Sequence, residues 1–256
     1  MASDTLAQVL NEILPDESYG NVERSNVISI KSAVEKTEFY KVSNHHEVYR
    51  VGASYLADCV DGIKSFAISS LGYQASQQRM ILGLASYFEN KKKMKIGIIS
   101  DNLFLGAFKT VVQSSKVIEV SGGGKTPMIL VHRFHEHFDF LDLNELIEQA
   151  KSPGVDFYDL LKEVMSLFDL VFWDVPELHK IETSRVQYFP SVKCFESLSI
   201  IVAKGYTRRE EVTQIRNFFS GYGINLKGLL LDEPRSPRTE DKISMTKRPW
   251  WKIWSP

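Results

Sequence analysis

Short apolar runs alternate with amphipathic stretches along most of this chain, and this alternation limits the folds open to it. The segment 169–177 (DLVFWDVPE) contains a continuous apolar run that ends in an acid, which is typical of a central parallel strand covered on both faces. Further strands are predicted at 64–69, 95–101, 127–134, 198–205 and 226–232, and helices at 47–60, 70–90, 141–150, 157–168 and 207–221. This order predicts an α/β fold with a doubly wound, mainly parallel sheet flanked by helices.

The chain length and composition favour one main domain. The 256 residues are 43% hydrophobic and 25% charged, as expected of a globular protein with one substantial core. We expect an N-terminal lead segment at 1–44, including a short helix at 5–14, and an α/β domain at 45–233. A basic, tryptophan-rich tail follows at 234–256.

Charge, cysteine content and hydropathy exclude several classes of protein. A net charge of −1 gives no reason to expect nucleic acid as a partner. The two cysteines, Cys59 and Cys194, form neither a disulfide framework nor a zinc motif, so a reducing cytoplasm fits. The N-terminus does not resemble a signal peptide, and no apolar run is long enough to span a membrane. Any membrane association is therefore expected to be peripheral.

The connection between the first predicted strand and its helix is where a phosphate-binding loop would lie. Such a loop needs glycines for backbone approach, a lysine for the phosphate charge and a Ser or Thr for magnesium. Only Gly72 is present, and Gln77 and Gln78 replace the Lys and Ser/Thr. Arg79 is a candidate substitute cation. We favour a helix N-terminus without a bound anion.

Two acids end predicted strands at the edge of the sheet where ligands of parallel α/β folds bind. Asp101 follows the strand at 95–101, and Asp174 follows the apolar run of 169–177. Each could coordinate magnesium directly or through water, or polarise an attacking water. Each could equally serve as a turn or helix-cap residue. Together with the preceding loop they outline a site.

A second segment contains the letters of a phosphate loop in the wrong setting. Residues 121–126 read SGGGKT, but Glu119 replaces the first glycine of the motif, and an apparent strand begins at Pro127. A phosphate loop must lead into a helix whose N-terminus faces the anion. We therefore interpret this segment as a glycine turn between two strands.

Three histidines lie close together with two acids in the segment 132–139. These residues are His132, His135, His137, Glu136 and Asp139. The spacing matches no HExxH metal motif, and alternation along a strand end would place only 135 and 137 on one face. A solvated strand end or loop is the favoured interpretation.

The C-terminal tail concentrates tryptophans beside cations. Trp250, Trp251 and Trp254 lie within 247–254, together with Lys247, Arg248 and Lys252. Tryptophan with Lys and Arg favours a membrane interface or an aromatic pocket on a partner. Folding back over the domain's own surface is an equally good alternative.

Taken together, residues 45–233 resemble the bacterial tyrosine kinase (BY-kinase) and capsule-regulator branch of the MinD/ParA-type ATPases. Glu47 and Arg50 lie in EVYR, which is similar to the start of that family's ExxRxxR oligomerisation helix, with Ala53 in place of the last Arg. The segment 168–178 resembles its Walker B stretch, and Asp101 falls on its Walker A′ acid. Similarity extends to 199–212 and 228–233. The resemblance implies a P-loop NTPase-like fold of the MinD/BY-kinase type.

The sequence of this chain differs from that family in the loop with which the family binds the nucleotide phosphates. The family's loop reads approximately GEGKS/T, which corresponds here to residues 74–78 (QASQQ). The C-terminal tyrosine cluster that family kinases autophosphorylate is replaced by Trp250, Trp251 and Trp254. Replacing the lysine by an amide removes a charge-assisted contact, so ATP hydrolysis and tyrosine autophosphorylation are both in doubt.

The leading hypothesis from the resemblance is a catalytically degenerate scaffold or regulator of exopolysaccharide or capsule synthesis and export. It would bind no cofactor and would dock onto an inner-membrane polysaccharide co-polymerase, with Glu47, Arg50 and the tryptophans as contacts. Homo- or hetero-oligomers with BY-kinase-like subunits are a further expectation. One alternative is an active ATPase or tyrosine autokinase that binds ATP and Mg through Arg79, Gly72 and the two acids. A MinD/ParA-like positioning factor is another.

Overall fold

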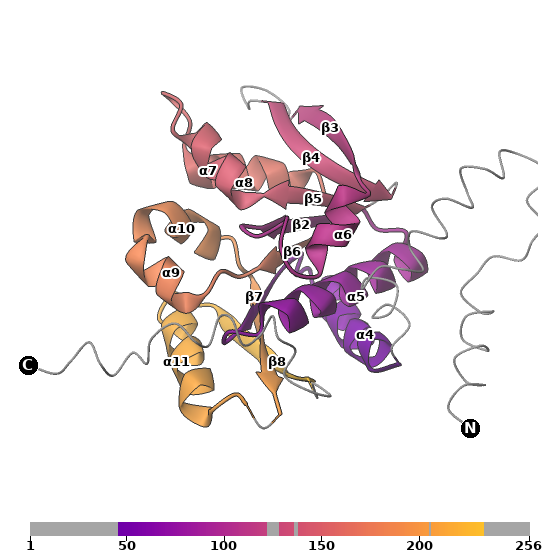
Figure 1. The fold of residues 1–256 in the computed structure, drawn as a ribbon, viewed down its shortest axis with the longest axis vertical. Coiled ribbons are helices and arrows are strands. Elements are labelled where there is room, and N and C mark those ends of the chain that lie inside the picture. Colours follow the sequence, from indigo (N-terminus) through magenta and orange to yellow (C-terminus); the bar gives the residue numbers. More distant parts are fainter. Residues whose placement is uncertain (1–45, 122–127, 136–137, 205, 233–256) are drawn as a thin grey trace, which may run out of the picture.

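The computed structural model describes residues 46–121, 128–135, 138–204 and 206–232. The whole lead segment at 1–44, with its predicted helix at 5–14, and the C-terminal tail at 234–256 lie outside these residues. The described part is one α/β unit, with a central sheet between two layers of helices (Figure 1). The doubly wound architecture expected from the sequence is confirmed.

The described strands form one sheet in the order β3-β4-β5-β2-β6-β1-β7-β8. Every neighbouring pair from β5 to β8 is parallel, whereas β4 is antiparallel to both β3 and β5. The mainly parallel character is therefore confirmed, with an antiparallel extension at one edge. The strands span Ser65–Ser70 (β1), Ile96–Ser100 (β2), Lys116–Ser121 (β3), Met128–His135 (β4), Phe138–Asp142 (β5), Leu170–Asp174 (β6), Ser197–Ala203 (β7) and Asn225–Asp232 (β8).

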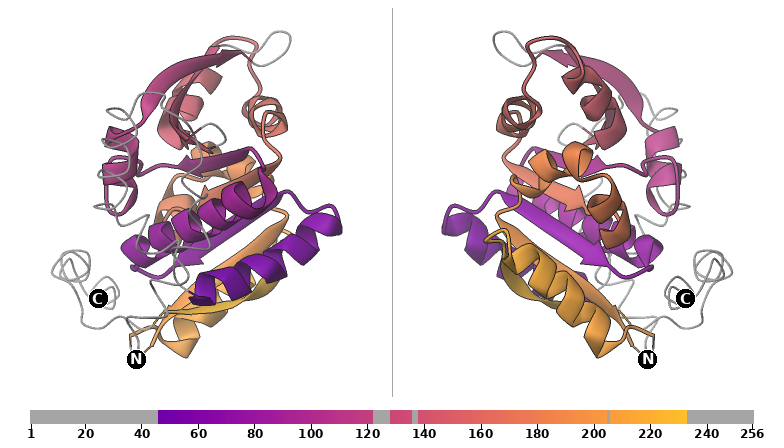
Figure 2. Two further views of the ribbon diagram at one scale, coloured as in Figure 1. Left: turned by 90° about the vertical axis from the view of Figure 1, so that its right-hand side faces the viewer. Right: turned by 90° about the vertical axis from the view of Figure 1, so that its left-hand side faces the viewer.

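Helices cover both faces of this sheet (Figure 2). One face packs against α4 (His46–Val60), α5 (Gln74–Lys92) and α6 (Phe108–Gln113). The other packs against α7 (Leu143–Ala150), α8 (Phe157–Ser166), α9 (Leu178–Thr183), α10 (Arg185–Val192) and α11 (Arg209–Ser220). No described helix is both long and apolar enough to cross a membrane.

The two cores follow directly from side-chain alternation along the central strands. In β6, Phe172 faces the core under α4, α5 and α6, while Val171 and Trp173 face the core under the other helices. All five residues of β6 are buried. A strand that is buried on both faces must read as a continuous apolar run, which is why sequence 169–177 predicts it correctly.

Four short elements were not predicted from the sequence, namely β5, α6, α9 and α10, and β3 was expected only as the strand before the glycine turn, without bounds. The strand β5 (FDFLD) contains two acids, so it does not read as an apolar run. One of them, Asp139, is buried in a bidentate ion pair with Arg133 on β4, at 2.8 and 2.7 Å. The other, Asp142, accepts a hydrogen bond from the Asn144 N–H and caps α7. The helix predicted from 141 therefore begins at Leu143.

The segment 207–210 (TRRE) has the spacing of a capping box, which predicts Thr207 and Glu210 as the capping residues at the start of α11. The expected pair was Thr207 and Glu210, but the helix begins at Arg209, and Glu211 accepts from the Arg208 N–H at 2.8 Å. The Thr207 hydroxyl instead accepts a hydrogen bond from the Ala203 N–H at 2.9 Å. The Glu contact of the capping box is therefore present one residue later than predicted, whereas Arg208 at the N-cap has no side-chain acceptor to replace the Thr hydroxyl.

Candidate functional site

The candidate site lies at the carboxyl ends of β1, β2 and β6, which are neighbours in the sheet. The connection from β1 to α5 is only Leu71, Gly72 and Tyr73. Gly72 has a φ of +73°, a left-handed conformation that glycine adopts without strain. Tyr73 is the N-cap residue, and its side chain makes no capping hydrogen bond. A connection this short places few backbone N–H groups around an anion.

Asp174 ends β6 and is 2% exposed. The Gln77 side-chain amide donates to its Oδ1 at 2.6 Å, and the Ser100 hydroxyl donates to its Oδ2 at 2.6 Å. The Gln77 amide also donates to the Val175 carbonyl at 2.9 Å, so both of its protons are engaged. The amide at the position of the phosphate lysine thus binds the protein's own carboxylate.

The pKa of the Asp174 carboxyl group is raised, because the group is buried and its hydrogen-bond donors are neutral. Burial raises its pKa to about 7, the hydrogen bonds from Ser100, Gln77 and Gln78 lower it, and the charge of Asp101 raises it. Desolvation is the largest of these effects. Near neutral pH the group is therefore partly protonated.

Gln78, at the position of the magnesium-binding Ser or Thr, connects α5 to the loop after β2. Its amide lies 3.5 Å from Asp174 Oδ2 and donates to the Asn102 carbonyl at 3.3 Å. Its carbonyl accepts from the Phe108 N–H at 3.4 Å. Gly106 packs directly on this amide, because a Cβ there would lie 2.3 Å from the Gln78 Oε1. Gln78 therefore fixes the loop that leads into α6.

Asp101 is held by groups from the other side of the site. Its Oδ2 forms an ion pair with Lys180 on α9 and accepts from the Tyr188 hydroxyl on α10 at 3.4 Å. Its Oδ1 accepts from the Asn102 amide at 2.7 Å. Burial lowers the pKa of Lys180, while the hydrogen bond and charge of Asp101 raise it, and the net shift is upward. Neither Lys180 nor Tyr188 could be predicted from the sequence, because neither belongs to a recognisable motif.

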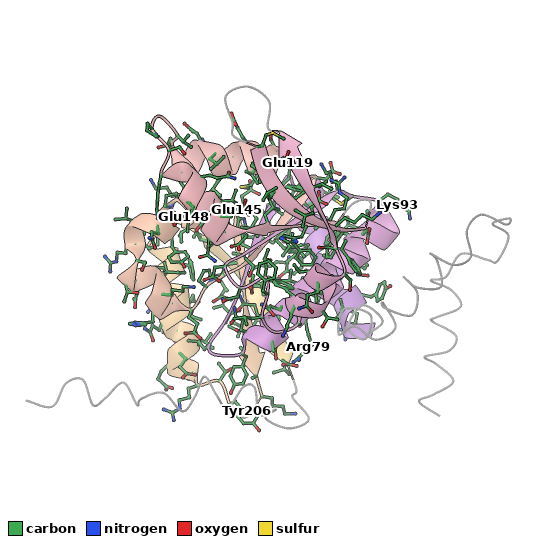
Figure 3. The ribbon with its side chains drawn as sticks, turned by 45° about the horizontal axis from the view of Figure 1, so that its top comes forward. Arg79, Lys93, Glu119, Glu145, Glu148 and Tyr206 are labelled. Carbon is green, nitrogen blue, oxygen red and sulfur yellow. The ribbon has the colours of Figure 1, made fainter. Side chains whose placement is uncertain are left out.

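Arg79, the candidate substitute cation, points away from both acids. Its guanidinium donates to the Ser76 hydroxyl one turn earlier on α5, at 3.0 Å. Figure 3 labels it on this helix. Among the described contacts, none joins Arg79 to Asp101 or Asp174. Among the described residues, Lys180 is the cation that pairs with one of the two acids, Asp101.

A small hollow lies beside the Gln77 amide. Its volume is about 10 Å³, enough for one water molecule. Pockets for small-molecule ligands commonly measure about 300–1,000 Å³. The residues that line the hollow are Ser70, Gly72, Gln74, Gln77, Val175 and Glu177. A phosphate placed at the Gln77 side chain would have to displace its hydrogen bond to Asp174.

The other predicted motifs lie away from these acids. Ser121 and Met128 pair in antiparallel strands, so the segment between them joins β3 to β4 and leads into a strand. Residues 122–126 themselves lie outside the described residues. His132 is near Ser115, with its Nδ1 3.4 Å from the hydroxyl, and burial lowers its pKa. The described residues contain no group of three or more metal-ligating side chains.

The candidate interaction residues are only partly within the described residues. Glu47 lies in the first turn of α4, and Arg50 is exposed on the same helix. His137, Glu136, Trp250, Trp251 and Trp254 lie outside the described residues. Their proposed contacts stay predictions.

No family model matches the sequence, and no curated protein is similar to it in sequence. Solved structures do match its fold. The kinase domain of VpsO has a TM-score of 0.50 at 16% identity, covering 84% of this chain and 100% of that one. The chimerical protein CapA2B2 has a TM-score of 0.52 at 12% identity, covering 92% and 100%. The BceF tyrosine kinase domain has a TM-score of 0.50 at 12% identity, covering 89% and 96%. The chain therefore has the P-loop NTPase-like α/β fold of bacterial tyrosine kinase domains.

Proposed function

We propose that this chain is a catalytically degenerate, BY-kinase-like regulator of exopolysaccharide or capsule synthesis and export. It would dock onto an inner-membrane polysaccharide co-polymerase and would bind no nucleotide. The observation that carries the proposal is the hydrogen bond from the Gln77 amide to Asp174 at 2.6 Å. This bond joins the position of the phosphate lysine to the position of the Walker B acid.

The charges at the site support a structural use of the acids. Phosphoryl transfer requires cations that offset the charge of the phosphates during the reaction. Here Gln77, Gln78 and Ser100 supply neutral donors to Asp174, and Lys180 is already paired with Asp101. A bound triphosphate would therefore have to compete with the protein's own carboxylates for every donor.

The cellular role rests on the sequence resemblance over residues 45–233 and on the shared fold. A kinase-like domain without a nucleotide grip retains surfaces for assembly. Regulation of polymer export through a membrane protein is the role that agrees best with such a domain. The exposed Arg50 on α4 is one candidate contact.

Calorimetry on the full chain tests the loss of nucleotide binding. ATP with magnesium chloride is titrated into the wild-type protein, and we expect no binding tighter than about 1 mM, or −4 kcal/mol. The ATP affinity of Gln77→Ala, which releases Asp174, is compared with that of Gln74→Ala, a control in the same helix turn. Micromolar binding by the wild-type protein that Asp174→Ala abolishes would favour the active ATPase and contradict the proposal.

A genetic experiment tests the regulatory role. Deletion of the gene should reduce surface polymer or change its chain length, and Asp174→Asn should restore the wild-type phenotype because no catalytic carboxylate is required. Purified full chain should also retain the detergent-solubilised co-polymerase from the same locus. Failure of Asp174→Asn to complement, despite normal protein levels, would indicate that the carboxylate has a catalytic role.

A further inference from the structure

A group of exposed apolar side chains surrounds the outer end of the sheet. It comprises Phe104, Leu105, Val117, Met128 and Leu130, whose exposed fractions are 51, 59, 57, 55 and 37%. We call these residues the outer patch. Phe104 and Leu105 belong to the loop after β2, and the other three belong to the β3–β4 hairpin. Large apolar side chains gathered on one surface commonly mark an interaction site.

Contacts join the loop to the hairpin. The Phe104 ring lies edge-on to the His132 ring, with centroids 5.5 Å apart. His132 on β4 is the strand partner of Val117 on β3, and Leu130 is the partner of Glu119. Next to them, α6 packs on β5 through Phe108 and Phe140, with centroids 5.4 Å apart. Figure 1 shows that β3 extends beyond α6, which contacts the neighbouring strand β4.

Alternation separates the outer patch from the core side of the hairpin. Ile118, Val120, Ile129 and Val131 face the core under α7 and α8. Val117 and Glu119 on β3 therefore share the opposite face with Met128, Leu130 and His132. Among these five residues of the hairpin face, only Glu119, which Figure 3 labels, is an Asp, Glu, Lys or Arg. The face is apolar with a single negative charge.

We propose that residues 247–254 of the same chain dock on the outer patch. This segment carries Trp250, Trp251 and Trp254 together with Lys247, Arg248 and Lys252, and it has no acid. Its composition thus complements an apolar surface that bears Glu119. Tryptophan rings bury about 150–250 Å² each, so three of them need a surface of several hundred Å². The exposed pair Leu229 and Leu231 on β8 offers less apolar surface than the five residues of the outer patch.

The connecting chain is long enough for this contact. The described chain ends at Asp232, at the carboxyl end of β8, and the loop with Phe104 leaves the carboxyl end of β2. Four strand spacings separate β8 from β2 and seven separate it from β3, which amount to about 19 Å and about 34 Å. Residues 233–246 can span up to about 46 Å when extended. The connecting segment is therefore long enough for residues 247–254 to reach the outer patch of the same chain.

Tryptophan fluorescence of the full chain tests the proposal. The fourth tryptophan, Trp173, is 1% exposed, so iodide quenching reports mainly on the three in the tail. In the wild-type protein we expect blue-shifted emission and weak quenching. Phe104→Ser with Leu130→Ser should shift the emission to the red and increase quenching several-fold. Leu229→Ser with Leu231→Ser removes exposed leucines elsewhere and should behave as wild type.

Other outcomes would overturn the inference. Equal, strong quenching in the wild-type protein and in the outer-patch variant would show that the tail does not dock there. Quenching that depends on protein concentration would indicate a second copy as the occupant. Protection that appears only after addition of phosphatidylglycerol vesicles would assign the segment to a membrane surface. Glu119→Lys provides a second variant on an exposed side chain, and it should also increase quenching if the docking is correct.

Discussion

Asp174 is a buried carboxyl group whose hydrogen-bond partners are all neutral, and its protonation should control stability near pH 7. Its pKa is raised to about 7, chiefly by burial, whereas an aspartate in an unfolded chain has a pKa of about 3.9. Between these values the folded protein holds a proton that the unfolded chain has released. The stabilisation from this proton is complete below about pH 4 and is lost as the pH rises through 7.

Asp174→Asn should therefore increase the free energy of unfolding at pH 8, by on the order of 1–3 kcal/mol. The gain should shrink as the pH falls toward 5, because the wild-type carboxyl group becomes neutral as well. Urea unfolding of both proteins at a series of pH values measures this difference. Asp139→Asn is the matched control, since Asp139 is buried but paired with Arg133, and it should lose stability at pH 8. A destabilised Asp174→Asn at pH 8 would contradict the assignment.

The pair of Asp101 and Lys180 should show energetic coupling. The Asp101 carboxyl group is fully covered, whereas the Lys180 side chain is 45% exposed. Lys180→Met leaves a buried carboxylate without its counterion and should cost about 1–2 kcal/mol, less than for a fully buried pair because solvent screens the charge. Asp101→Asn combined with Lys180→Met should cost less than the sum of the single changes. Additive losses in a urea-unfolding cycle would show that the contact contributes nothing to stability.

At the scale of elements, the loop between β2 and α6 is held by its fit to Gln78. Gly106 has a φ of +59°, and a Cβ would lie 2.3 Å from Gln78 Oε1. Gly106→Ala should lower the free energy of unfolding by about 2–3 kcal/mol, of which about 1 kcal/mol reflects the left-handed backbone. In a Gln78→Ala background the loss should fall toward that backbone cost. The free energies of unfolding of the wild-type protein, the two single variants and the double variant are compared by thermal unfolding.

Gly223→Ala separates backbone strain from the contact with Gln78. Gly223 has a φ of +76° and no atom within 4 Å of the added Cβ. Its substitution should cost about 1 kcal/mol, with or without Gln78→Ala. If Gly106→Ala and Gly223→Ala cost the same in the wild-type background, then Gln78 does not constrain the loop.

The elements predicted well from the sequence are those whose pattern is set by burial alone. β6 and β7 are mainly apolar because helices cover both of their faces, and α11 shows its buried face at Ile215 and Phe219. The sequence did not predict β5 or the bounds of β3, for the opposite reason. β3 has exposed residues on its outer face, and the acids of β5 depend on partners, such as Arg133, that only the folded chain supplies.

The residues of the candidate site likewise include some that the sequence pattern identifies and others that only the fold brings together. Asp101 and Asp174 were found because strand ends of a parallel sheet converge on one edge. Gln77 and Gln78 were identified as departures from a motif, but their bonds to Asp174 could not be read from spacing. Lys180 and Tyr188 come from α9 and α10, and their approach to Asp101 depends on how these helices pack.

For the molecule as a whole, the proposed loss of nucleotide binding would rest on more than one motif. The β1–α5 connection is three residues long, and Tyr73 within it is buried. Asp174 is satisfied by donors from α5 and β2, and Asp101 by groups from α9 and α10. Restoring the family's letters in one segment would leave the remaining contacts unchanged.

A triple substitution tests this view. Ser76→Gly, Gln77→Lys and Gln78→Thr restore the GK[ST] element at positions 76–78, yet we expect no ATP binding tighter than about 1 mM by calorimetry with magnesium. The reason is that the introduced lysine would take the position of the Gln77 amide and pair with Asp174 instead of a phosphate. That pairing should lower the pKa of Asp174 and weaken the pH dependence of unfolding between pH 5 and 8. Micromolar ATP binding by the triple variant would show instead that these three side chains alone account for the missing grip.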